Sequence, residues 1–524
     1  MGLEKNQEYE VTIEDMGNEG EGIGHIEGVA VFVKDTVPGD VVRIKIIKVK
    51  KNYAFGRLME VISPSKHRVE PVCLHARKCG GCTIMHVSYE KQLAWKQDKV
   101  KNCLQRIGGI ADVETKMESI IGMECAHSFP AIRYRNKAQF PVRKNKEGKL
   151  VIGFYAGRTH SVIDTDVCYL QDGINDQIIR RLRSFMEKYA VEAYDEEKHT
   201  GLVRHILTRV GRRTGEVMVC LIINGDVLMG SLEGGLNGRD ERGRKRQQEN
   251  GLYEKDDREL KWRQGDGWEQ KNDKESKIKS EKIVQKGTFR NVEQEFVKYM
   301  LDIPGITSIS ININKEKTNR ILGGHCRTIW GEDFITDYIG NVKYQISPLS
   351  FYQVNPEQTE KLYGKALEYA DLHGDETVWD LYCGIGTISL FLAQKAKKVC
   401  GVEIVPEAIE DARRNAEING IQNVEFFVGK AEEVLPEQYG KTKEHADVIV
   451  VDPPRKGCDA VALDTMIKME PKRIVYVSCD PATLARDVKV LVSAGYEVAK
   501  VCALDQFGHC GHVEVVTCLQ RVDA

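Results

Sequence analysis

Four short apolar runs that alternate with helical stretches constrain the C-terminal part of this chain more than any other feature. The runs cover residues 377–381, 398–403, 447–452 and 473–478, and stretches of helical periodicity such as 406–419 lie between them. Runs rich in Val and Ile that are separated by helices are typical of a parallel sheet covered on both faces. We therefore predict an α/β domain with a doubly wound, Rossmann-like sheet over residues 341–524.

The first of these strands leads into a loop suited to a nucleotide-like cofactor. In Asp380-Leu-Tyr-Cys-Gly-Ile-Gly-Thr387, Gly384 and Gly386 let the backbone approach a ligand at a strand end, where such sheets bind their ligands. Glu403 ends the next strand and could accept both hydroxyls of a ribose. The third glycine of the Gly-x-Gly-x-x-Gly dinucleotide motif is absent. This favours S-adenosylmethionine, which has no phosphate, over a dinucleotide.

Two further strand ends carry side chains that could act on a flat ring. Asp452-Pro-Pro-Arg455 predicts a rigid loop in which Asp452 hydrogen-bonds a base edge. Similar loops of amine N-methyltransferases have an aromatic residue where Arg455 stands, so amine methylation is less favoured. Cys479 follows the next strand and precedes a predicted helix start at Pro481, a position that lowers the pKa of a thiol. A thiolate there can add to C6 of uracil or cytosine and make C5 nucleophilic.

The covalent interpretation also needs a base that removes the C5 proton. Glu514, in Phe507-Gly-His-Cys-Gly-His-Val-Glu514, is one candidate, and His509 and His512 are rivals that spacing does not rank. For Cys479 taken alone, a structural cysteine is an equal alternative.

The N-terminal residues 1–62 predict a small barrel of short strands. The segments 9–13, 29–33 and 41–49 have strand patterns, and glycines supply the turns between them. Such a barrel is OB-like, the type that binds nucleic acid, or SH3-like. The chain has a net charge of −2, but basic residues gather within 43–57 and 133–149, where they suit phosphate contacts or form solvated faces.

A group of cysteines follows the predicted barrel. Cys73, Cys79 and Cys82 lie within ten residues, and Cys168 could be a fourth ligand of zinc or of an iron–sulfur cluster. Three cysteines close together and a distant fourth favour an iron–sulfur cluster over a zinc site, because zinc sites usually consist of two paired Cys-x2-Cys knuckles. The Cys-x3-Cys-x2-Cys spacing of radical S-adenosylmethionine enzymes is not matched, which favours a structural cluster.

The middle of the chain predicts an α+β unit over residues 63–340 with two special segments. A helix over 89–107 has an apolar stripe formed by Leu93, Val100, Leu104 and Ile107, which predicts core packing. The pattern over residues 126–228 predicts mostly strands. Residues 229–290 are charge-dense and predict a disordered insertion, more typical of a surface insertion than of an RNA-binding tail.

The sequence has no long apolar run and no apolar leader. We therefore expect the protein in the cytoplasm, where cysteines stay reduced.

Together these residues resemble the RNA uracil-C5 methyltransferases, in particular the bacterial 23S ribosomal RNA (uracil-C5)-methyltransferases, over nearly the whole chain outside 229–290. The resemblance implies that residues 1–62 are a TRAM domain and that the helix over 89–107 packs on the catalytic domain. It implies [4Fe-4S] ligands at Cys73, Cys79, Cys82 and Cys168, and cofactor contacts at Gln353, Tyr382, Glu403 and Asp452. It makes Cys479 the nucleophile and Glu514 the proton acceptor. One departure is Phe507-Gly-His-Cys510, where family members often have Phe-Pro-x-Thr.

The implied function is S-adenosylmethionine-dependent methylation of C5 of a uridine in RNA, with ribosomal RNA as the favoured substrate. The expected protein is a monomer that binds neither DNA nor a membrane. The alternatives are a transfer-RNA uracil-C5 methyltransferase, an RNA cytosine-C5 methyltransferase and a non-catalytic RNA-binding protein.

Overall fold

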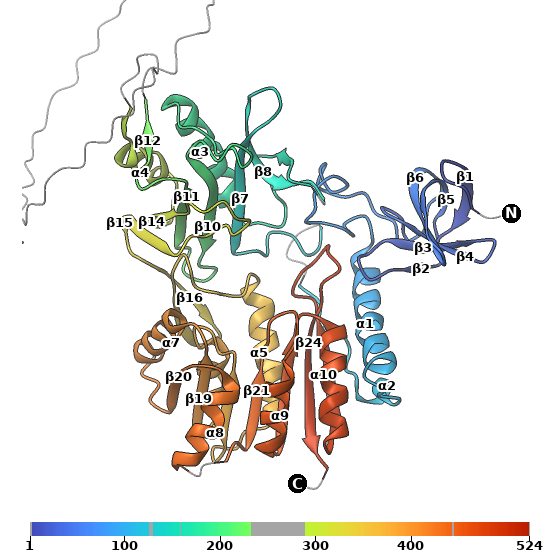
Figure 1. Cartoon of the computed structure of the whole chain (residues 1–524), viewed down its shortest axis with the longest axis vertical. Helices are drawn as coiled ribbons and strands as arrows, with labels where there is room; N and C mark the ends of the chain where they lie inside the picture. The colour runs from blue at the N-terminus through green and yellow to red at the C-terminus, as the bar shows by residue number, and fades with distance from the viewer. Residues whose placement is uncertain (1–2, 125–128, 158, 232–288, 443–444, 523–524) are drawn as a thin grey trace, which may run out of the picture.

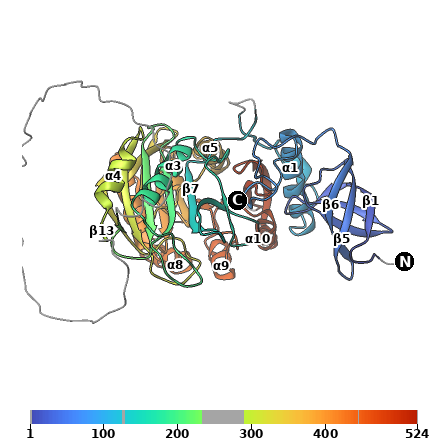
Figure 2. The ribbon, with the colours of Figure 1, turned by 90° about the horizontal axis from the view of Figure 1, so that it is seen from above.

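The computed structural model of the protein describes residues 3–124, 129–157, 159–231, 289–442 and 445–522. They form an N-terminal barrel, a central sheet with two helices, and a C-terminal sheet covered by helices (Figure 1). Seen from above in Figure 2, the barrel and the central sheet lie at opposite ends of the molecule. No helix within these ranges combines the length and the apolar character that a membrane span needs. The multidomain fold class predicted from the sequence is confirmed.

The barrel is a six-stranded sheet in the order β1-β5-β6-β4-β3-β2. Alternation along β5 turns Val42, Ile44 and Ile46 into the interior and leaves Arg43 outside. The strands are β1 Glu8–Thr12, β2 Asp15–Met16, β3 Gly22–Ile26, β4 Val29–Val33, β5 Val41–Val49 and β6 Tyr53–Ser63.

The central unit is a seven-stranded sheet in the order β15-β14-β11-β10-β7-β8-β9. Helices α3 Ile174–Lys188 and α4 Glu293–Leu301 pack on it through Phe185 and Phe296, whose ring centroids are 5.2 Å apart. Helix α3 lies in a stretch that the sequence predicted mostly as strands; its amphipathic pattern was missed. The strands are β7 Lys137–Lys144, β8 Leu150–Tyr155, β9 Val162–Asp164, β10 Val203–Val210, β11 Val217–Ile223, β14 Ile306–Ile313 and β15 His325–Gly331.

The ends of the predicted insertion over 229–290 meet in a short ribbon. Strands β12 Met229–Gly230 and β13 Arg290–Asn291 pair antiparallel. The rest of the predicted disordered segment, residues 232–288, lies outside the described residues. After the central unit, the hairpin of β16 Ile335–Ile339 and β17 Val342–Ile346 leads into the C-terminal unit.

The C-terminal sheet has seven strands in the order β20-β19-β18-β21-β22-β24-β23. All neighbours among the first five strands in this order pair parallel, as predicted, and β24 is inserted antiparallel between β22 and β23. The strands are β18 Thr377–Leu381, β19 Lys398–Glu403, β20 Val424–Val428, β21 Val448–Val451, β22 Arg473–Ser478, β23 Tyr496–Leu504 and β24 Glu514–Arg521.

Each face of this sheet has its own helix layer and hydrophobic core. One face carries α5 Pro356–Ala370, α6 Thr387–Leu392 and α7 Pro406–Ile418. The other carries α8 Ala431–Thr442, α9 Ala460–Lys468 and α10 Pro481–Ser493. Successive strand residues turn to opposite cores: Val378 belongs to the first and Trp379 to the second.

Helix α1 Tyr89–Arg106, followed by the short α2 Val113–Lys116, crosses from the N-terminal segment to the C-terminal unit (Figure 1). It packs on α10, and Val100 and Leu104 belong to the second core of the C-terminal sheet. The predicted stripe is wrong for Ile107, which is 41% exposed. The buried face instead includes Gln92 and Lys96, whose partners lie near the active site described below.

Candidate active site

The candidate active site lies where the strands of the C-terminal sheet end. β18 is the switch point of the sheet, because the chain continues from it through β19 to β20 on one side and returns to β21 on the other. Ser478 of β22 pairs with Val515 of β24, which places Cys479 beside Glu514 on adjacent antiparallel strands. Asp452 directly follows β21, the other neighbour of β22. The fold therefore brings together Cys479, Glu514 and Asp452.

Three carboxyl groups meet at this place: Asp380 and Glu514 are buried, and Asp452 is half-buried. Burial raises the pKa of Glu514, the charge of Asp452 raises it further, and Arg455 partly opposes both effects. Burial likewise raises the pKa of Asp452. Burial raises the pKa of Asp380 to about 7, although the Ser389 hydroxyl donates a hydrogen bond of 2.5 Å to this carboxylate. The site can therefore hold and release protons near neutral pH.

The environment of Cys479 differs from the sequence-based prediction. Burial and the charges of Glu514 and Asp452 raise the pKa of this thiol to about 11, and Arg455 only partly offsets them. The start of α10 does not reverse the shift, because the Asp480 carboxylate already accepts hydrogen bonds from the Ala482 and Thr483 N–H groups at 2.9 and 3.1 Å. The predicted lowering of the pKa was wrong, since burial and neighbouring negative charge raise the pKa of this thiol.

The loop after β18 has the open backbone that a cofactor needs. Tyr382, Gly384 and Gly386 have positive φ angles of 68°, 54° and 80°. The Glu403 carboxylate accepts hydrogen bonds from the Gly384 and Val405 N–H groups at 3.3 and 3.0 Å, which holds it against this loop. A Cβ atom at Gly384 would meet nothing within 4 Å. An open glycine loop beside a strand-end carboxylate fits the adenosine part of S-adenosylmethionine.

Gln353 lies on the segment that enters α5 and is 8% exposed. Its backbone carbonyl accepts a hydrogen bond of 3.0 Å from Asn136 Nδ2, at the boundary with the central unit. Among the described residues, this contact links Gln353 to the central unit, and no hydrogen bond joins it to Tyr382 or Glu403.

Comparisons with known proteins show to which family the chain belongs. The protein-family model described as tRNA (uracil-5-)-methyltransferase matches residues 327–522, and the family model of the TRAM domain matches residues 2–59. A protein of Clostridium tetani named "uncharacterized RNA methyltransferase" is 46% identical over 98% of this chain and 96% of its own length. A relative of the same description from Halalkalibacterium halodurans is 44% identical over 99% and 98%. The chain belongs to the tRNA (uracil-5-)-methyltransferase family.

A solved structure shares the architecture of this methyltransferase. It is the tRNA (uracil-54, C5)-methyltransferase of Pyrococcus abyssi in complex with S-adenosyl-L-homocysteine. The TM-score is 0.68 and the identity 25%, over 98% of this chain and 100% of that one. The predicted family, the TRAM domain and the S-adenosylmethionine cofactor are thereby confirmed, and the protein is an RNA uracil-C5 methyltransferase.

The two histidines that competed with Glu514 have other surroundings in the methyltransferase. His509 is 1% exposed, and its two ring nitrogens lie 3.1 Å from Gln92 Nε2 and 3.0 Å from the Pro130 carbonyl. His512 is on the surface, and burial of part of its ring together with Arg455 lowers its pKa. His509 thus holds the loop over 505–513 in place, which favours Glu514 as the base.

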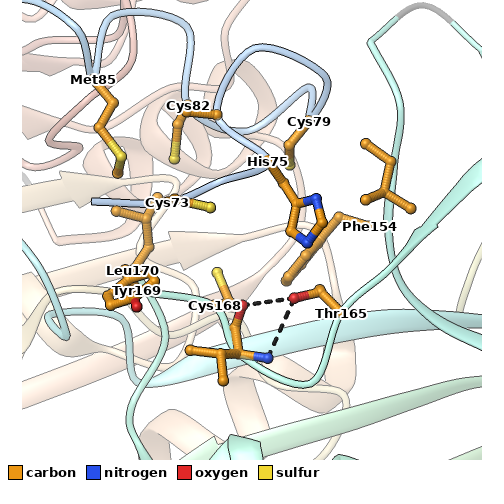
Figure 3. Close-up of a pocket in the computed structure, with 13 residues that line it drawn as sticks. Cys73, His75, Cys79, Cys82, Met85, Phe154, Thr165, Cys168, Tyr169 and Leu170 are labelled. Carbon is orange, nitrogen blue, oxygen red and sulfur yellow. Dashed lines mark hydrogen bonds between the residues drawn. The ribbon is translucent and has the colours of Figure 1, made fainter. Parts of the chain in front are cut away.

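The four cysteines of the predicted cluster line one small cavity of about 30 Å³ together with His75 (Figure 3). Burial and the neighbouring thiols Cys79 and Cys73 raise the pKa of Cys168 to about 11. Among the described residues, no three or more His, Cys, Asp or Glu side chains are arranged so that they could hold a metal ion. The fold gathers the four thiols, and their role as ligands stays a prediction.

Two residues of the site were missed by the sequence analysis. Asp380 opens the glycine motif and lies within reach of the charge of Asp452. Tyr363 is 1% exposed on α5, its hydroxyl lies 2.9 Å from Thr387 Oγ1, and burial together with the charge of Asp452 raises its pKa. Asp380 could have been found from its motif, whereas nothing in the pattern of α5 distinguishes Tyr363 from a core residue.

Proposed function

We propose that this methyltransferase methylates C5 of a uridine in ribosomal RNA through a covalent adduct at Cys479. The observation that carries the proposal is the pairing of β22 with β24, which sets a thiol and a buried carboxylate side by side. A nucleophile and a proton acceptor on neighbouring strand ends are the two groups that uracil-C5 chemistry requires.

The Cys479 sulfur forms a bond to C6 of the uracil, and its proton passes to a carboxylate of the site. The electron pair of the C5–C6 double bond moves toward the C4 carbonyl, so C5 becomes nucleophilic. Arg455, which lowers the pKa of both Cys479 and Glu514, stabilises the negative charge that develops here.

S-adenosylmethionine, when bound, supplies an electrophilic methyl group for C5. Gln353, Tyr382, Glu403 and Asp452 are the residues we propose to hold it, with Glu403 on the ribose hydroxyls. Glu514 then removes the C5 proton; the electron pair re-forms the C5–C6 double bond, and the C6–sulfur bond breaks. The raised pKa of Glu514 makes it a stronger base for this step than an exposed glutamate.

Two substitutions test the chemistry. Cys479→Ala should lower methylation of an RNA transcript by roughly a thousandfold or more, as expected for loss of a nucleophile. Cys103→Ser, which alters a half-buried thiol on α1, should leave activity unchanged. Persistent uridine methylation by the Cys479 variant would refute the covalent route.

Glu514→Gln should slow turnover by roughly 10²–10⁴-fold, because no base removes the C5 proton. The adduct should then accumulate and survive denaturing electrophoresis as a protein–RNA species. A variant that turns over normally without adduct would exclude Glu514 as the proton acceptor.

The RNA class is the second part of the proposal. The combination of a TRAM barrel with the cysteine segment supports ribosomal RNA, and the similarity to the Pyrococcus abyssi enzyme favours transfer RNA as the alternative. Nucleoside mass spectrometry of both RNAs from cells lacking the protein distinguishes the two substrates. We expect 5-methyluridine to disappear from ribosomal RNA. Its loss from transfer RNA, or loss of 5-methylcytidine, would contradict the proposal. Light scattering should show a monomer.

The four cysteines are proposed to hold a [4Fe-4S] cluster, which would cross-link residues 73–82 to Cys168. A set of four thiols around one cavity fits the donor chemistry of such a cluster. Anaerobically purified protein should contain about four iron atoms and four sulfides per chain, and Cys168→Ser should lower both. One zinc ion per chain would contradict the cluster.

A further inference from the structure

A cavity in the central unit, separate from the strand ends that hold Cys479, has the chemistry of a nucleotide site. Its volume is about 640 Å³, within the range of roughly 300–1,000 Å³ that suits small-molecule sites. It adjoins the four-cysteine cavity, since Phe154 lines both and Gly80 and Gly81 of the cysteine segment form part of its wall. No residue that lines it belongs to the loops carrying Cys479, Asp452 or Glu514.

Two arginines in its wall are held in fixed positions. Tyr194 is 2% exposed, and the guanidinium groups of Arg204 and Arg143 lie 4.5 and 5.7 Å from its ring centroid. Arg204 also donates hydrogen bonds to the backbone carbonyls of Asn314 and Glu316 at 2.8 and 2.7 Å. These contacts order both charges before any ligand arrives, which lowers the entropy lost on binding.

The charge of the cavity is positive. Arg143, Arg204, Lys317 and Arg320 line it, against one carboxylate, Glu196. That carboxylate is already engaged, because it accepts hydrogen bonds from Arg143 Nη2 at 3.4 Å and His160 Nδ1 at 3.0 Å. The surplus of positive charge suits a phosphate group.

The cavity also offers groups for a base. Tyr155, which is half-buried, and His160 both line the cavity, and their ring centroids are 6.1 Å apart with the planes tilted by 57°. His205 is 4% exposed, and its Nδ1 has no hydrogen-bond partner among the described residues. Burial and the two arginines keep this imidazole neutral by lowering its pKa to about 3, so its ring nitrogens are one donor and one acceptor. Aromatic rings and arginine planes are the surfaces on which unpaired RNA bases stack.

A second, open cavity of about 850 Å³ continues from the first and shares Arg143, His160, Tyr194 and Glu196 with it. Its four cations are balanced by four carboxylates: Arg143, Lys144, Lys146 and Lys198 against Glu192, Asp195, Glu196 and Glu197. Two of these lysines are paired directly, Lys144 with Glu192 at 2.6 Å and Lys198 with Asp195 at 3.3 Å. The surplus charge is thus confined to the first cavity, while the groove extends beyond it, as a polymer requires and a free nucleotide does not.

We propose that the Arg143–Arg204 cavity binds an unpaired nucleotide of the substrate RNA other than the target uridine, with its phosphate near Lys317 and Arg320. The inference rests on the proposed function in that RNA is the substrate. It makes the central unit a second point of RNA recognition, which fixes the register of the strand that enters the active site.

The test uses the full-length protein and a ribosomal RNA transcript. Lys317→Ala/Arg320→Ala changes two exposed side chains, so the fold should persist. It should raise the Kd for the transcript about tenfold and weaken the salt dependence of binding, raise KM and leave kcat at saturating RNA unchanged. Lys315→Ala is the matched control, because Lys315 is exposed on the same loop, pairs with Asp226 and lies outside the cavity lining. Equal Kd values for the double variant and the wild type would overturn the proposal.

Cross-linking locates the contact and separates the two proposals. A transcript with 4-thiouridine at unpaired positions should cross-link to Tyr155 or to residues 317–321, in the wild type and in Cys479→Ala alike. Failure of the covalent mechanism would leave this cross-link intact, whereas a transcript that cross-links to neither Tyr155 nor residues 317–321 would refute the cavity. Uridine or adenosine monophosphate at millimolar concentration should compete only weakly. Tight binding of a monophosphate that leaves the RNA contact unchanged would show a free-nucleotide site instead.

Discussion

The strand ends gather three carboxyl groups and one thiol, with Arg455 as the cation that acts on Cys479 and Glu514. Each carboxylate makes its neighbours harder to ionise, so the pKa of Glu514 and that of Cys479 rise together. Burial and these charges together make Glu514 a strong base and keep Cys479 protonated in the free enzyme. Reactivity at this site depends on the balance between Asp452 and Arg455 rather than on the thiol alone.

Removing that cation should move the pH profile. Glu514 must be deprotonated to accept the C5 proton, so the rate should rise with pH through the raised pKa of Glu514. Arg455→Met removes a charge that lowers this pKa, and the rising limb of kcat/KM should shift upward by roughly 1 pH unit. Lys456→Ala, a neighbouring exposed cation, should not shift it. An unchanged limb in Arg455→Met would show that another group controls the rate.

Helix α1 holds the loop over 505–513 that leads to Glu514. Lys96 Nζ lies 2.5 Å from Asp505 Oδ1, with both side chains 0% exposed, and donates to the Phe507 carbonyl at 2.8 Å. One turn before, Gln92 accepts from the His509 N–H at 3.1 Å. One turn after, Lys99 donates to the Gly511 carbonyl at 2.9 Å. A helix from the start of the chain thus fixes a loop near its end.

Breaking the buried ion pair should affect both stability and turnover. Lys96→Met leaves the Asp505 charge buried without its partner, and should lower the free energy of unfolding by about 3–5 kcal/mol. The double variant Lys96→Met/Asp505→Leu, in which neither charge remains, should recover most of the lost free energy of unfolding. Urea unfolding of both variants measures the difference. If α1 positions Glu514 through this loop, Gln92→Ala should accumulate the denaturant-stable RNA adduct, as Glu514→Gln does. Reduced stability without adduct would mean that the helix only supports the fold.

At the scale of the whole molecule, RNA-binding groups lie at both ends. The barrel carries Phe32, Tyr53 and Phe55, whose ring centroids are 5.5 to 5.9 Å apart and whose side chains are partly exposed. The Arg143–Arg204 cavity lies in the central unit. The barrel is also packed on the rest of the chain, through Met16 and Val37 against Ile84 and Trp95, so it can hold RNA at a fixed position relative to the catalytic sheet.

The aromatic group of the barrel should contribute by stacking. Tyr53→Ala/Phe55→Ala should weaken transcript binding by about tenfold, since stacking of one base is worth roughly 1–3 kcal/mol. Binding of S-adenosylmethionine, measured by calorimetry, should not change. Val490→Ala, an exposed apolar residue on α10, is the control. Unchanged RNA affinity would show that the barrel acts through its basic residues.

Local features of this protein could be predicted from the sequence because they depend on neighbouring residues. The alternation of apolar runs predicts the parallel sheet, and Gly384 and Gly386 predict an open loop that the backbone angles show. The motif around Cys479 and the glutamate at 514 predict a thiol and a base. In each case the information lies within about ten residues, where backbone sterics and hydrophobic periodicity act.

Other features depend on contacts between residues far apart in the chain, which sequence spacing does not encode. The antiparallel insertion of β24 sets Glu514 beside Cys479, and burial together with the crowding of negative charge reverses the shift expected for the thiol pKa. The buried polar face of α1 is a second example. The sequence predicts only an apolar stripe on this helix, and the role of its polar residues becomes visible only from their contacts with His509 and Asp505. Charge–charge energy and burial depend on distance in space, so these properties exist only once the chain has folded.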